Sequence, residues 1–349
     1  MTLLSMVNHR QGRLLGRMES LGFNLRAEAT LAATTLEILK SHEIEGELLE
    51  HDEVRSSVAR QLGMEIAGLV PADRDVDGIV EVMLDATHNF REPLTAQRLF
   101  HWHQSLFPLE KQRTQKMVIG QWRMNTVDNP MQVVSGPIGR ERIHFRAPDS
   151  ALIEKEMSMF LDWFNSENEL NPILKAAIGH LWFVTIHPFV DGNGRLARTI
   201  SDMLLTRADG IPQRFYSMSA QIRIERKSYY TNLEKTQRAT TDITSWLLWF
   251  LDCLDRSLTA SEHELARVLF KATFWDYAKE RPLSLRQQKM INLLLDGFEG
   301  KLTSSKWAKI CKCSQDTASR DIQDLINKKI LVQEAGGGRS TSYTLFDPK

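Results

Sequence analysis

Twelve consecutive residues, His187-Pro-Phe-Val-Asp-Gly-Asn-Gly-Arg-Leu-Ala-Arg198, supply the side-chain types that a nucleotide-transfer site requires. The ordinary pKa of a histidine lies near neutrality, so the imidazole of His187 can accept a proton from an incoming hydroxyl group. Asp191 can bind magnesium, an ion that usually takes one or two protein carboxylates together with substrate phosphates. The segment therefore predicts a site that holds a nucleoside triphosphate and transfers part of it.

The second half of this segment is suited to phosphate. Gly192, Asn193 and Gly194 permit a tight turn in which successive backbone N–H groups point at one anion. A helix is predicted to begin at Gly194, so the turn lies at a helix N-terminus, where unpaired amides and the helix dipole favour phosphate. Arg195 and Arg198 are three residues apart and project from one helix face, and each guanidinium group can bind two phosphate oxygens at once.

Two predicted helices position these residues. The apolar stretch over 174–186 reads as a helix that ends at His187, because Pro188 disfavours helical geometry in the residue before it. The helix predicted over 194–205 has an apolar stripe formed by Leu196, Ile200, Met203 and Leu204. Each candidate site residue, taken alone, has an ordinary structural explanation as a helix cap, a turn residue or an exposed arginine. Their order and spacing together favour the functional interpretation.

The segment resembles the signature of the Fic family, His-x-Phe-x-(Asp/Glu)-Gly-Asn-Gly-Arg-x-x-Arg, and matches it at every specified position. The resemblance implies a protein adenylyltransferase that transfers AMP from ATP to a Ser, Thr or Tyr hydroxyl group of a protein, the chain itself included. By position, His187 resembles the general base, Asp191 the magnesium ligand and residues 192–194 the anion hole. Arg195 and Arg198 resemble the clamp on the β and γ phosphates.

Gly194 separates two branches of that family. In the branch that uses ATP as a phosphate donor a lysine stands at this position, so the glycine favours transfer of the nucleotidyl group. Two alternatives stay open. The same site would serve the reverse reaction, which removes AMP from a protein, and a DNA-binding regulator would use a nucleotide site to sense rather than to catalyse.

A second motif, Ser41-His-Glu-Ile-Glu-Gly46, lies in a helix predicted over 27–49. It resembles the inhibitory motif of the family, (Ser/Thr)-x-x-x-Glu-(Gly/Asn). The resemblance implies that Ser41, Glu45 and Gly46 belong to an inhibitory segment, in which Glu45 pairs with Arg198 and occupies space that the γ phosphate needs. Taken alone, Glu45 would be one exposed acid among the neighbouring Glu43, Glu47, Glu50, Asp52 and Glu53.

A hairpin is predicted where β-branched runs flank Gly136-Pro137 and Gly139. This hairpin resembles the flap beside the active site of the family, which aligns the target segment by strand addition. The resemblance makes Val133 and Val134 the target-binding residues of the flap, against the alternative of an ordinary surface hairpin.

After the signature, the chain contains Tyr229, Tyr230 and Gln237, and these three residues resemble the adenine-pocket segment of the family. Aromatic faces suit a purine ring. Paired tyrosines on a helix also serve as half-buried packing, so the two interpretations of Tyr229 and Tyr230 stay open.

The composition sets the class of protein. Lys and Arg number 44, as do Asp and Glu, so the global charge identifies no partner. Apolar runs are all much shorter than the roughly 20 residues of a membrane span, and the N-terminus does not resemble a secretory signal. Cys253, Cys311 and Cys313 form neither a disulfide framework nor a zinc-site spacing. We therefore expect a cytoplasmic protein with no membrane partner.

The expected fold is mainly α: a Fic-type helical bundle with a β-hairpin flap, followed by a C-terminal winged helix-turn-helix domain. Residues 1–90 are expected to form an N-terminal helical region with the inhibitory motif, 91–280 the Fic catalytic core and 285–349 the winged helix-like domain. Only 117–146 looks extended. Helices before residue 281 are predicted at 11–21, 27–49, 52–62, 74–89, 95–106, 150–166, 171–186, 194–208, 225–237, 241–257 and 260–280.

The C-terminal domain is predicted from the pattern after Pro282. Helices are expected at 287–296, at 303–310 with Thr303 as its N-cap, and at 314–326, followed by β-like runs at 330–333 and 342–345. This order resembles a winged helix-turn-helix module, whose third helix would read a DNA groove. The residues expected to face the groove or lie on the wing are Gln315, Thr317, Ser319, Arg320, Arg339 and Ser340.

The partner of this module stays open between DNA, contacted through 314–340, and another protein. Residues 285–349 contain 11 Lys and Arg against 7 Asp and Glu, a modest excess for a phosphate footprint. Asp316, Asp321 and Asp324 lie on the helix that would enter the groove. These acids slightly favour a protein-docking or dimerising module, and the subgroup often dimerises, which makes a homodimer a further expectation.

Overall fold

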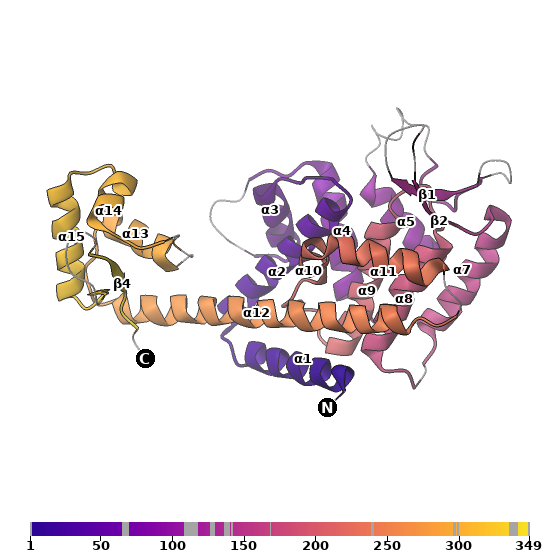
Figure 1. Ribbon diagram of the computed structural model, residues 1–349, viewed down its shortest axis with the longest axis horizontal. Helices are drawn as coiled ribbons and strands as arrows, with labels where there is room; N and C mark the ends of the chain where they lie inside the picture. Colours follow the sequence, from indigo (N-terminus) through magenta and orange to yellow (C-terminus); the bar gives the residue numbers. More distant parts are fainter. Residues whose placement is uncertain are drawn as a thin grey trace. The chain divides into compact units, whose positions relative to one another are not determined.

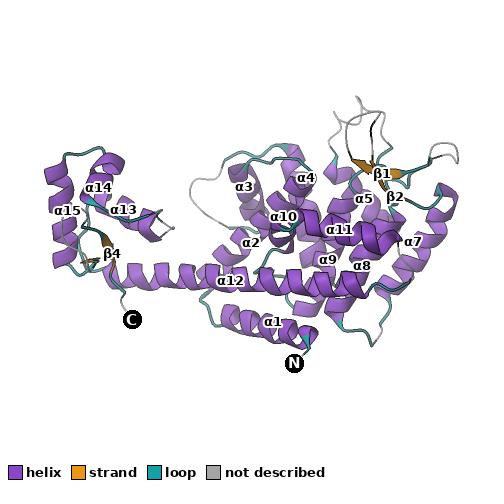
Figure 2. Ribbon diagram, viewed as in Figure 1, coloured by secondary structure: helices purple, strands orange, loops and turns teal. Residues whose placement is uncertain are grey.

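The computed structural model describes residues 2–64, 70–107, 118–125, 130–135, 140, 142–167, 169–238, 241–295, 298, 300–334 and 341–347. The chain is mainly helical, as the sequence predicts (Figure 2). It divides into two compact units, Met1–Glu262 and His263–Lys349, which we call unit 1 and unit 2. None of the described helices is long and apolar enough to cross a membrane.

The described residues of unit 1 form helices and one hairpin (Figure 1). A short helix, α10, has seven residues and is absent from the sequence prediction, because so short a segment shows no clear helical period. The helices are α1 (Leu3–Glu19), α2 (Phe23–Ile44), α3 (His51–Gln61), α4 (Arg74–His88), α5 (Ala96–Leu106), α7 (Ser150–Asn165), α8 (Pro172–Ile186), α9 (Asn193–Asp209), α10 (Met218–Ile224), α11 (Arg226–Arg238) and the first part of α12 (Thr244–Ala278).

The centre of unit 1 is the pair α8 and α9. α8 is apolar on all sides, with buried residues such as Ala176, Phe183 and Ile186, which is typical of a helix inside the core. α1, α2 and α4 pack against α9, and α7 packs against α8. The connection over 187–192 is therefore held at both ends by buried helices, and this connection carries the predicted site.

The helix α12 continues through the break predicted between 257 and 260, so the prediction of two separate helices there is wrong. The intervening residues include no glycine or proline. The Ser257 hydroxyl donates to Leu254 O at 2.9 Å and the Thr259 hydroxyl to Asp255 O at 2.8 Å. These polar side chains bond to the preceding turn of the helix and therefore do not interrupt it.

The helix α2 ends at Ile44, five residues before the predicted end, because Gly46 adopts a left-handed conformation with φ 86°. The N–H groups of Glu45 and Glu47 both donate to His42 O, at 3.0 Å each. This is the hydrogen-bonded turn with which a glycine closes a helix. Glu45, Gly46 and Glu47, which we call the acidic turn, therefore lie outside the helix that was predicted to contain them.

The predicted hairpin is present as an antiparallel pair, β1 (Gln132–Ser135) and β2 (Arg142–Arg146) (Figure 1). Val133 is opposite Phe145 in this pair. Its expected turn residues 136, 137 and 139 lie outside the described residues. β2 is fastened to α11, since Arg238 donates to His144 O at 2.9 Å and to Ile143 O at 2.7 Å. Among the described residues no further strand pairs with β1.

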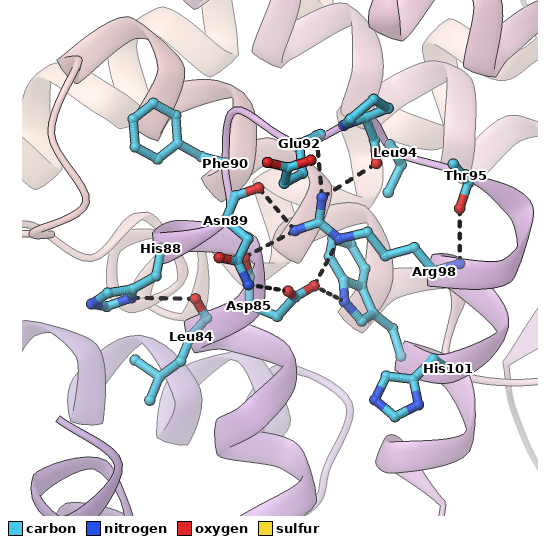
Figure 3. Close-up of polar contacts among 12 residues, drawn as sticks. Leu84, Asp85, His88, Asn89, Phe90, Glu92, Leu94, Thr95, Arg98 and His101 are labelled. Carbon is cyan, nitrogen blue, oxygen red and sulfur yellow. Dashed lines mark hydrogen bonds and ion pairs between the residues drawn. The ribbon is translucent and has the colours of Figure 1, made fainter. Parts of the chain in front are cut away.

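Arg98 on α5 holds the end of α4 (Figure 3). Its Nε donates to Asp85 Oδ2 at 2.7 Å, and its Nη2 donates to Asp85 O at 2.9 Å and to Asn89 O at 3.1 Å. Trp102 Nε1 donates to the same carboxylate at 2.7 Å. The carbonyl groups of Asp85 and Asn89 each accept a backbone N–H as well, and the added bonds from Arg98 fix α5, which also carries His103, against α4.

Unit 2 follows the predicted order of elements: α13 (Leu285–Leu295), α14 (Ser304–Cys311), α15 (Gln315–Asn327) and the antiparallel strands β3 (Leu331–Gln333) and β4 (Tyr343–Leu345). Thr303 caps α14 as predicted, accepting from Lys306 N. Its core gathers apolar residues from all three helices around the fully buried Trp307. Arg339 and Ser340, expected on the wing, lie outside the described residues.

Candidate functional site

His187 ends α8 in a left-handed conformation, with φ 52° and ψ 57°, which residues other than glycine rarely adopt. Its Nδ1 lies 3.1 Å from Val184 O, so Nδ1 carries the proton and donates it, and Nε2 is the unprotonated nitrogen. Burial, together with the positive charge of Arg123, lowers the pKa of His187 to about 4. The imidazole is therefore neutral near pH 7, the state that a general base requires.

Arg123 holds the backbone beside this imidazole. Its Nε donates to His187 O at 2.7 Å, its backbone N–H to Pro188 O at 2.9 Å and its Nη2 to Pro148 O at 2.6 Å. Arg123 is not predictable from the sequence, because it lies 64 residues before His187 and no spacing rule connects the two.

The glycine turn, Gly192-Asn193-Gly194, begins α9. Gly192 has φ 80° and acts as the N-cap. The Asn193 side chain closes the preceding loop, since its Oδ1 accepts from Phe189 N at 2.9 Å and its Nδ2 donates to Phe189 O at 2.8 Å. The first bond of the helix runs from Leu196 N to Gly192 O, so the N–H groups of residues 193–195 point out of the helix N-terminus, where they can bind an anion.

His103 on α5 supports the loop from the other side. Its Nδ1 accepts from Gly120 N at 3.0 Å, and its Nε2 lies 3.2 Å from Asp191 O, to which it donates. The ring stacks on Phe189 with centroids 4.1 Å apart. Burial lowers the pKa of His103 to about 4, so its ring is neutral. His103 is not predictable from the sequence either, because it lies 88 positions before Asp191.

Asp191 presents one carboxylate to solvent, with 61% of its side chain exposed. Its Oδ1 accepts from Gly192 N at 2.6 Å, and its Oδ2 lies 3.8 Å from Arg195 Nη2. Among the described residues no group of three or more His, Cys, Asp or Glu side chains could hold a metal ion. Asp191 fits the magnesium mode in which one carboxylate joins substrate phosphates and water.

Arg198 is almost fully buried and meets the segment predicted to be inhibitory. Its Nε donates to Ser41 Oγ at 2.9 Å, its Nη2 to Ser41 O at 2.8 Å, and its Nη1 lies 2.8 Å from Glu45 Oε1. The Tyr230 hydroxyl donates to the other Glu45 oxygen at 3.3 Å. Burial alone would raise the pKa of Glu45, but the charge and hydrogen bond of Arg198, the charge of Arg195 and the hydrogen bond from Tyr230 together outweigh it. The pKa therefore lies below its usual value, and Glu45 is ionised.

Gly194 allows the carboxylate of Glu45 to lie directly against the glycine turn. A Cβ atom at Gly194 would clash with Glu45 Oε1 and would also meet Arg198 Nη1 at 3.4 Å. The Glu45 carboxylate therefore lies at the N-terminus of α9, where helix amides and a guanidinium group both favour an anion.

Arg195 is also paired with an acid of the acidic turn. Its Nη1 lies 2.6 Å from Glu47 Oε2, and its guanidinium group lies over the ring of Phe107 at 4.8 Å. From the sequence alone, Glu47 is one of several acidic neighbours of Glu45 with no predicted role. Its contact with Arg195 joins residues 148 positions apart, so local spacing gives no signal of it.

The three residues expected at the adenine pocket lie in different environments. Tyr230 contacts Glu45, as described above. Tyr229 is 1% exposed, and its hydroxyl bonds to His180 Nε2 at 2.9 Å, so its ring is part of the core. Gln237 Nε2 donates to Thr185 Oγ1 at 3.2 Å, near the end of α8. The hydroxyl group of Tyr230 therefore bonds to Glu45, whereas Tyr229 lies beside Arg198 within the core.

The flap residues differ in exposure. Val134 is 46% exposed on β1, whereas Val133 is partly buried. A separate pocket of about 620 Å³ opens beside Arg98, between α4 and α5. None of the residues that line it belongs to 187–198, so this pocket is distinct from the site built around His187.

Family models match two parts of the chain. Residues 93–205 match the Fic/DOC family, and residues 1–64 match a domain of unknown function (DUF4172). The first range contains the whole site from His187 to Arg198, and the second contains Glu45 and Glu47. The chain therefore contains a Fic/DOC domain, preceded by a region with its own family model.

Curated relatives of this domain are protein adenylyltransferases named Fic. The chain is 36% identical over 110 residues to the one from Nematostella vectensis, covering 31% of this chain and 24% of the relative. It is 38% identical over 104 residues to the one from Drosophila mojavensis, covering 29% of this chain and 19% of the relative. The similarity thus spans about a quarter or less of each relative.

Solved structures show the same fold. A Fic family protein from Desulfovibrio desulfuricans G20 aligns with a TM-score of 0.52 at 18% identity, covering 100% of this chain and 98% of the other. A Fic domain containing signaling protein from Bacteroides thetaiotaomicron VPI-5482 aligns with a TM-score of 0.53 at 20% identity, covering 73% and 95%. The expected Fic-type helical fold is confirmed by these two structures.

Proposed function

We propose that this protein transfers AMP from ATP to a Ser, Thr or Tyr hydroxyl group of a protein. The observation that carries the proposal is the neutral His187, whose Nδ1 donates to Val184 O while Nε2 stays an acceptor in a loop that leads directly into the glycine turn. The adenylyltransferases named Fic that share this domain support the same reaction. ATP is thus a substrate and a hydroxyl-bearing protein the partner.

Each residue of the site has a role in this reaction. The N–H groups of 193–195, with Arg195 and Arg198, bind the β and γ phosphates. Nε2 of His187 takes the proton of the target hydroxyl group while the oxygen of that hydroxyl group bonds to the α phosphorus. The bond between the α phosphorus and the oxygen that bridges it to the β phosphorus breaks, and pyrophosphate leaves. Magnesium held by Asp191 would neutralise charge on the phosphates. Positioning and charge neutralisation supply most of the catalysis.

The hairpin of β1 and β2 is the flap to which a strand of the target protein would add in this proposal. α11 fastens β2 through Arg238 and also through Glu234, which lies 2.9 Å from Arg142 Nη2 and 2.7 Å from His144 Nδ1. With β2 fixed in this way, the outer edge of β1 is the edge that a target strand would join. Val133 and Val134 would then contact the side chains of the target.

We further propose that Glu45 inhibits the transfer. Its carboxylate lies 2.8 Å from Arg198 Nη1 and against Gly194, and a triphosphate bound to the same groups would have to displace it. Ser41 and Tyr230 help to hold the arginine and the carboxylate in place.

The experiment is labelling with ATP that carries radioactive phosphorus at the α position. Glu45→Gly should raise the label on the chain or on proteins of a lysate at least tenfold, because Arg198 becomes accessible to the triphosphate. Adding His187→Ala to Glu45→Gly should abolish that label. Equal label in the wild type and in both variants would contradict the proposal.

As a second function, we propose that unit 2 binds double-stranded DNA through α15. Two of the acidic residues on α15 that would repel DNA form ion pairs with basic residues of unit 2. Asp321 pairs with Arg286 at 2.5 and 3.0 Å, and Asp324 pairs with Lys328 at 2.6 Å. The exposed side chains of α15 include four of types that hydrogen-bond to base edges or phosphates, Gln315, Ser319, Arg320 and Gln323.

The test is fluorescence anisotropy with labelled genomic duplexes at several salt concentrations. Binding should weaken as salt rises, and Arg320→Ala should reduce the affinity about tenfold, the effect of losing roughly 1.4 kcal/mol. Arg267→Ala, which removes an exposed arginine paired with Glu264 on α12, is the matched control and should bind like the wild type. The absence of binding at low salt would leave protein docking as the role of unit 2.

A further inference from the structure

Arg195 is a buried cation whose main partner is Glu47. Its side chain is 3% exposed, and Nη1 lies 2.6 Å from Glu47 Oε2, whereas the nearest oxygen of Asp191 is 3.8 Å from Nη2. Nε of Arg195 is buried and has no hydrogen-bond partner among the described residues. The ring of Phe107 covers one face of the Arg195 guanidinium group. A phosphate that is to pair with Nη1 of Arg195 therefore has to take the place of Glu47.

Glu47 and Glu45 reach the two arginines from the same turn. Their N–H groups share one acceptor, His42 O, and between them lies Gly46 with φ 86°. One turn of backbone thus places one carboxylate on Arg198 and a second on Arg195. A movement that withdraws this turn from α9 would free both arginines together.

We propose that Glu47 is a second inhibitory carboxylate, which occupies the phosphate position on Arg195 while Glu45 occupies that on Arg198. This inference rests on the proposed function, in which the two arginines hold the β and γ phosphates of ATP. Both carboxylates leave only for a ligand with anionic groups at both positions. A nucleoside triphosphate meets this requirement, and a nucleoside monophosphate does not.

The burial of Arg195 gives the proposal a consequence for stability as well as for activity. Removing one partner of a buried ion pair leaves the other charge without compensation. A chain without the Glu47 charge should therefore be less stable when no nucleotide is bound, and nucleotide should stabilise it more, because only the phosphates can then neutralise Arg195.

The experiment introduces Glu47→Gln, which keeps the shape of the side chain and removes its charge, into the wild type and into Glu45→Gly. Each variant is compared with its parent. Calorimetry with a non-hydrolysable ATP analogue and magnesium should give a dissociation constant about tenfold lower for Glu47→Gln than for its parent in both backgrounds. Thermal unfolding should show a lower Tm for Glu47→Gln without the analogue and a larger rise of Tm with it. Glu50→Gln, an exposed acid at the start of α3, is the matched control and should change neither value.

The outcomes separate this inference from the proposed function. If Glu45→Gly transfers AMP while Glu47→Gln changes neither the affinity nor the Tm shift, the inference is wrong and the function stands. If neither Glu45→Gly nor the double variant transfers AMP, the proposed function is wrong, and the affinity of Glu47→Gln for the analogue still decides the inference. If Glu47→Gln does not fold, Glu47→Asp replaces it and should bind the analogue more tightly than the wild type, because the shorter side chain holds Arg195 less well.

Discussion

The chemistry of a single residue, His187, depends on a proton that the backbone holds in place. The bond from Nδ1 to Val184 O fixes the tautomer, and a pKa of about 4 keeps the ring neutral across the physiological range. A base with so low a pKa accepts a proton only from a well-placed donor, so geometry matters more here than basicity. Arg123 supplies that geometry through the carbonyl groups of His187 and Pro188.

We therefore expect Arg123→Ala, in the Glu45→Gly background, to lower kcat for AMP transfer by roughly ten- to a hundredfold, since a misplacement of about 1 Å can have that effect. The affinity for ATP should stay unchanged, because Arg123 bonds to no residue of the glycine turn. Steady-state kinetics and calorimetry separate the two quantities. Arg74→Ala, an exposed arginine at the start of α4, should alter neither, and an equal loss of affinity in Arg123→Ala would contradict the account.

At the scale of elements, the site depends on where helices end. α8 ends at His187, α9 begins at the glycine turn, and α2 ends one residue before Glu45. The end of α2 matters most for control, because Gly46 turns the chain so that the acidic turn reaches Arg195 and Arg198. A longer α2, as the sequence predicts, would continue the helical direction past Glu45.

Gly46→Ala tests this role of the helix end. No atom lies within 4 Å of the position of the new Cβ, so the cost comes from the φ of 86° and amounts to about 1–2 kcal/mol of folding stability. The strained turn should also hold Glu45 less firmly and raise basal AMP transfer. Gly210→Ala, with φ 75° and equal space at the end of α9, should show the same loss of stability by urea unfolding without added activity. Equal activity in both variants would refute the proposed role of the turn.

The sequence predicts the parts of the site that are local. The signature from His187 to Arg198 spans twelve residues, and the helices around it have clear apolar periods, so both could be predicted. Arg123, His103 and Glu47 could not, because they reach the site across 64, 88 and 148 residues through contacts that only the folded chain creates. The position of Glu45 outside its helix was missed because one glycine conformation decides it.

At the scale of the whole molecule, unit 1 contains several histidines that folding keeps neutral. Burial lowers the pKa of His42 and His180 to about 3 and that of His103 and His187 to about 4. In the unfolded chain each has a pKa near 6.5. Between these values the unfolded chain binds protons that the folded chain does not, so the free energy of unfolding rises with pH.

We expect this stability to be fully present above pH 6.5 and to be lost as the pH falls from 6.5 towards 4, by up to about 1.4 kcal/mol per pH unit for each histidine. Urea unfolding followed by tryptophan fluorescence at pH 7.5, 6.0 and 5.0 measures it. A constant free energy of unfolding from pH 7.5 to 5.0 would show that these rings are not held neutral.

The two family matches also divide the proposed control from the proposed chemistry. The acidic turn belongs to the range 1–64, whereas the arginines that it contacts belong to the Fic/DOC range 93–205. A signal that relieves inhibition would therefore act on the first range to change the activity of the second. The expected division of the chain at 90, 280 and 285 stays a prediction.

A crystal structure of the Glu45→Gly chain with magnesium and a non-hydrolysable ATP analogue would show where the nucleotide binds. We expect the β and γ phosphates on the amides of 193–195 with Arg195 and Arg198 beside them, and the α phosphorus facing Nε2 of His187. A nucleotide bound elsewhere, with the glycine turn empty and His187 still covered, would contradict it.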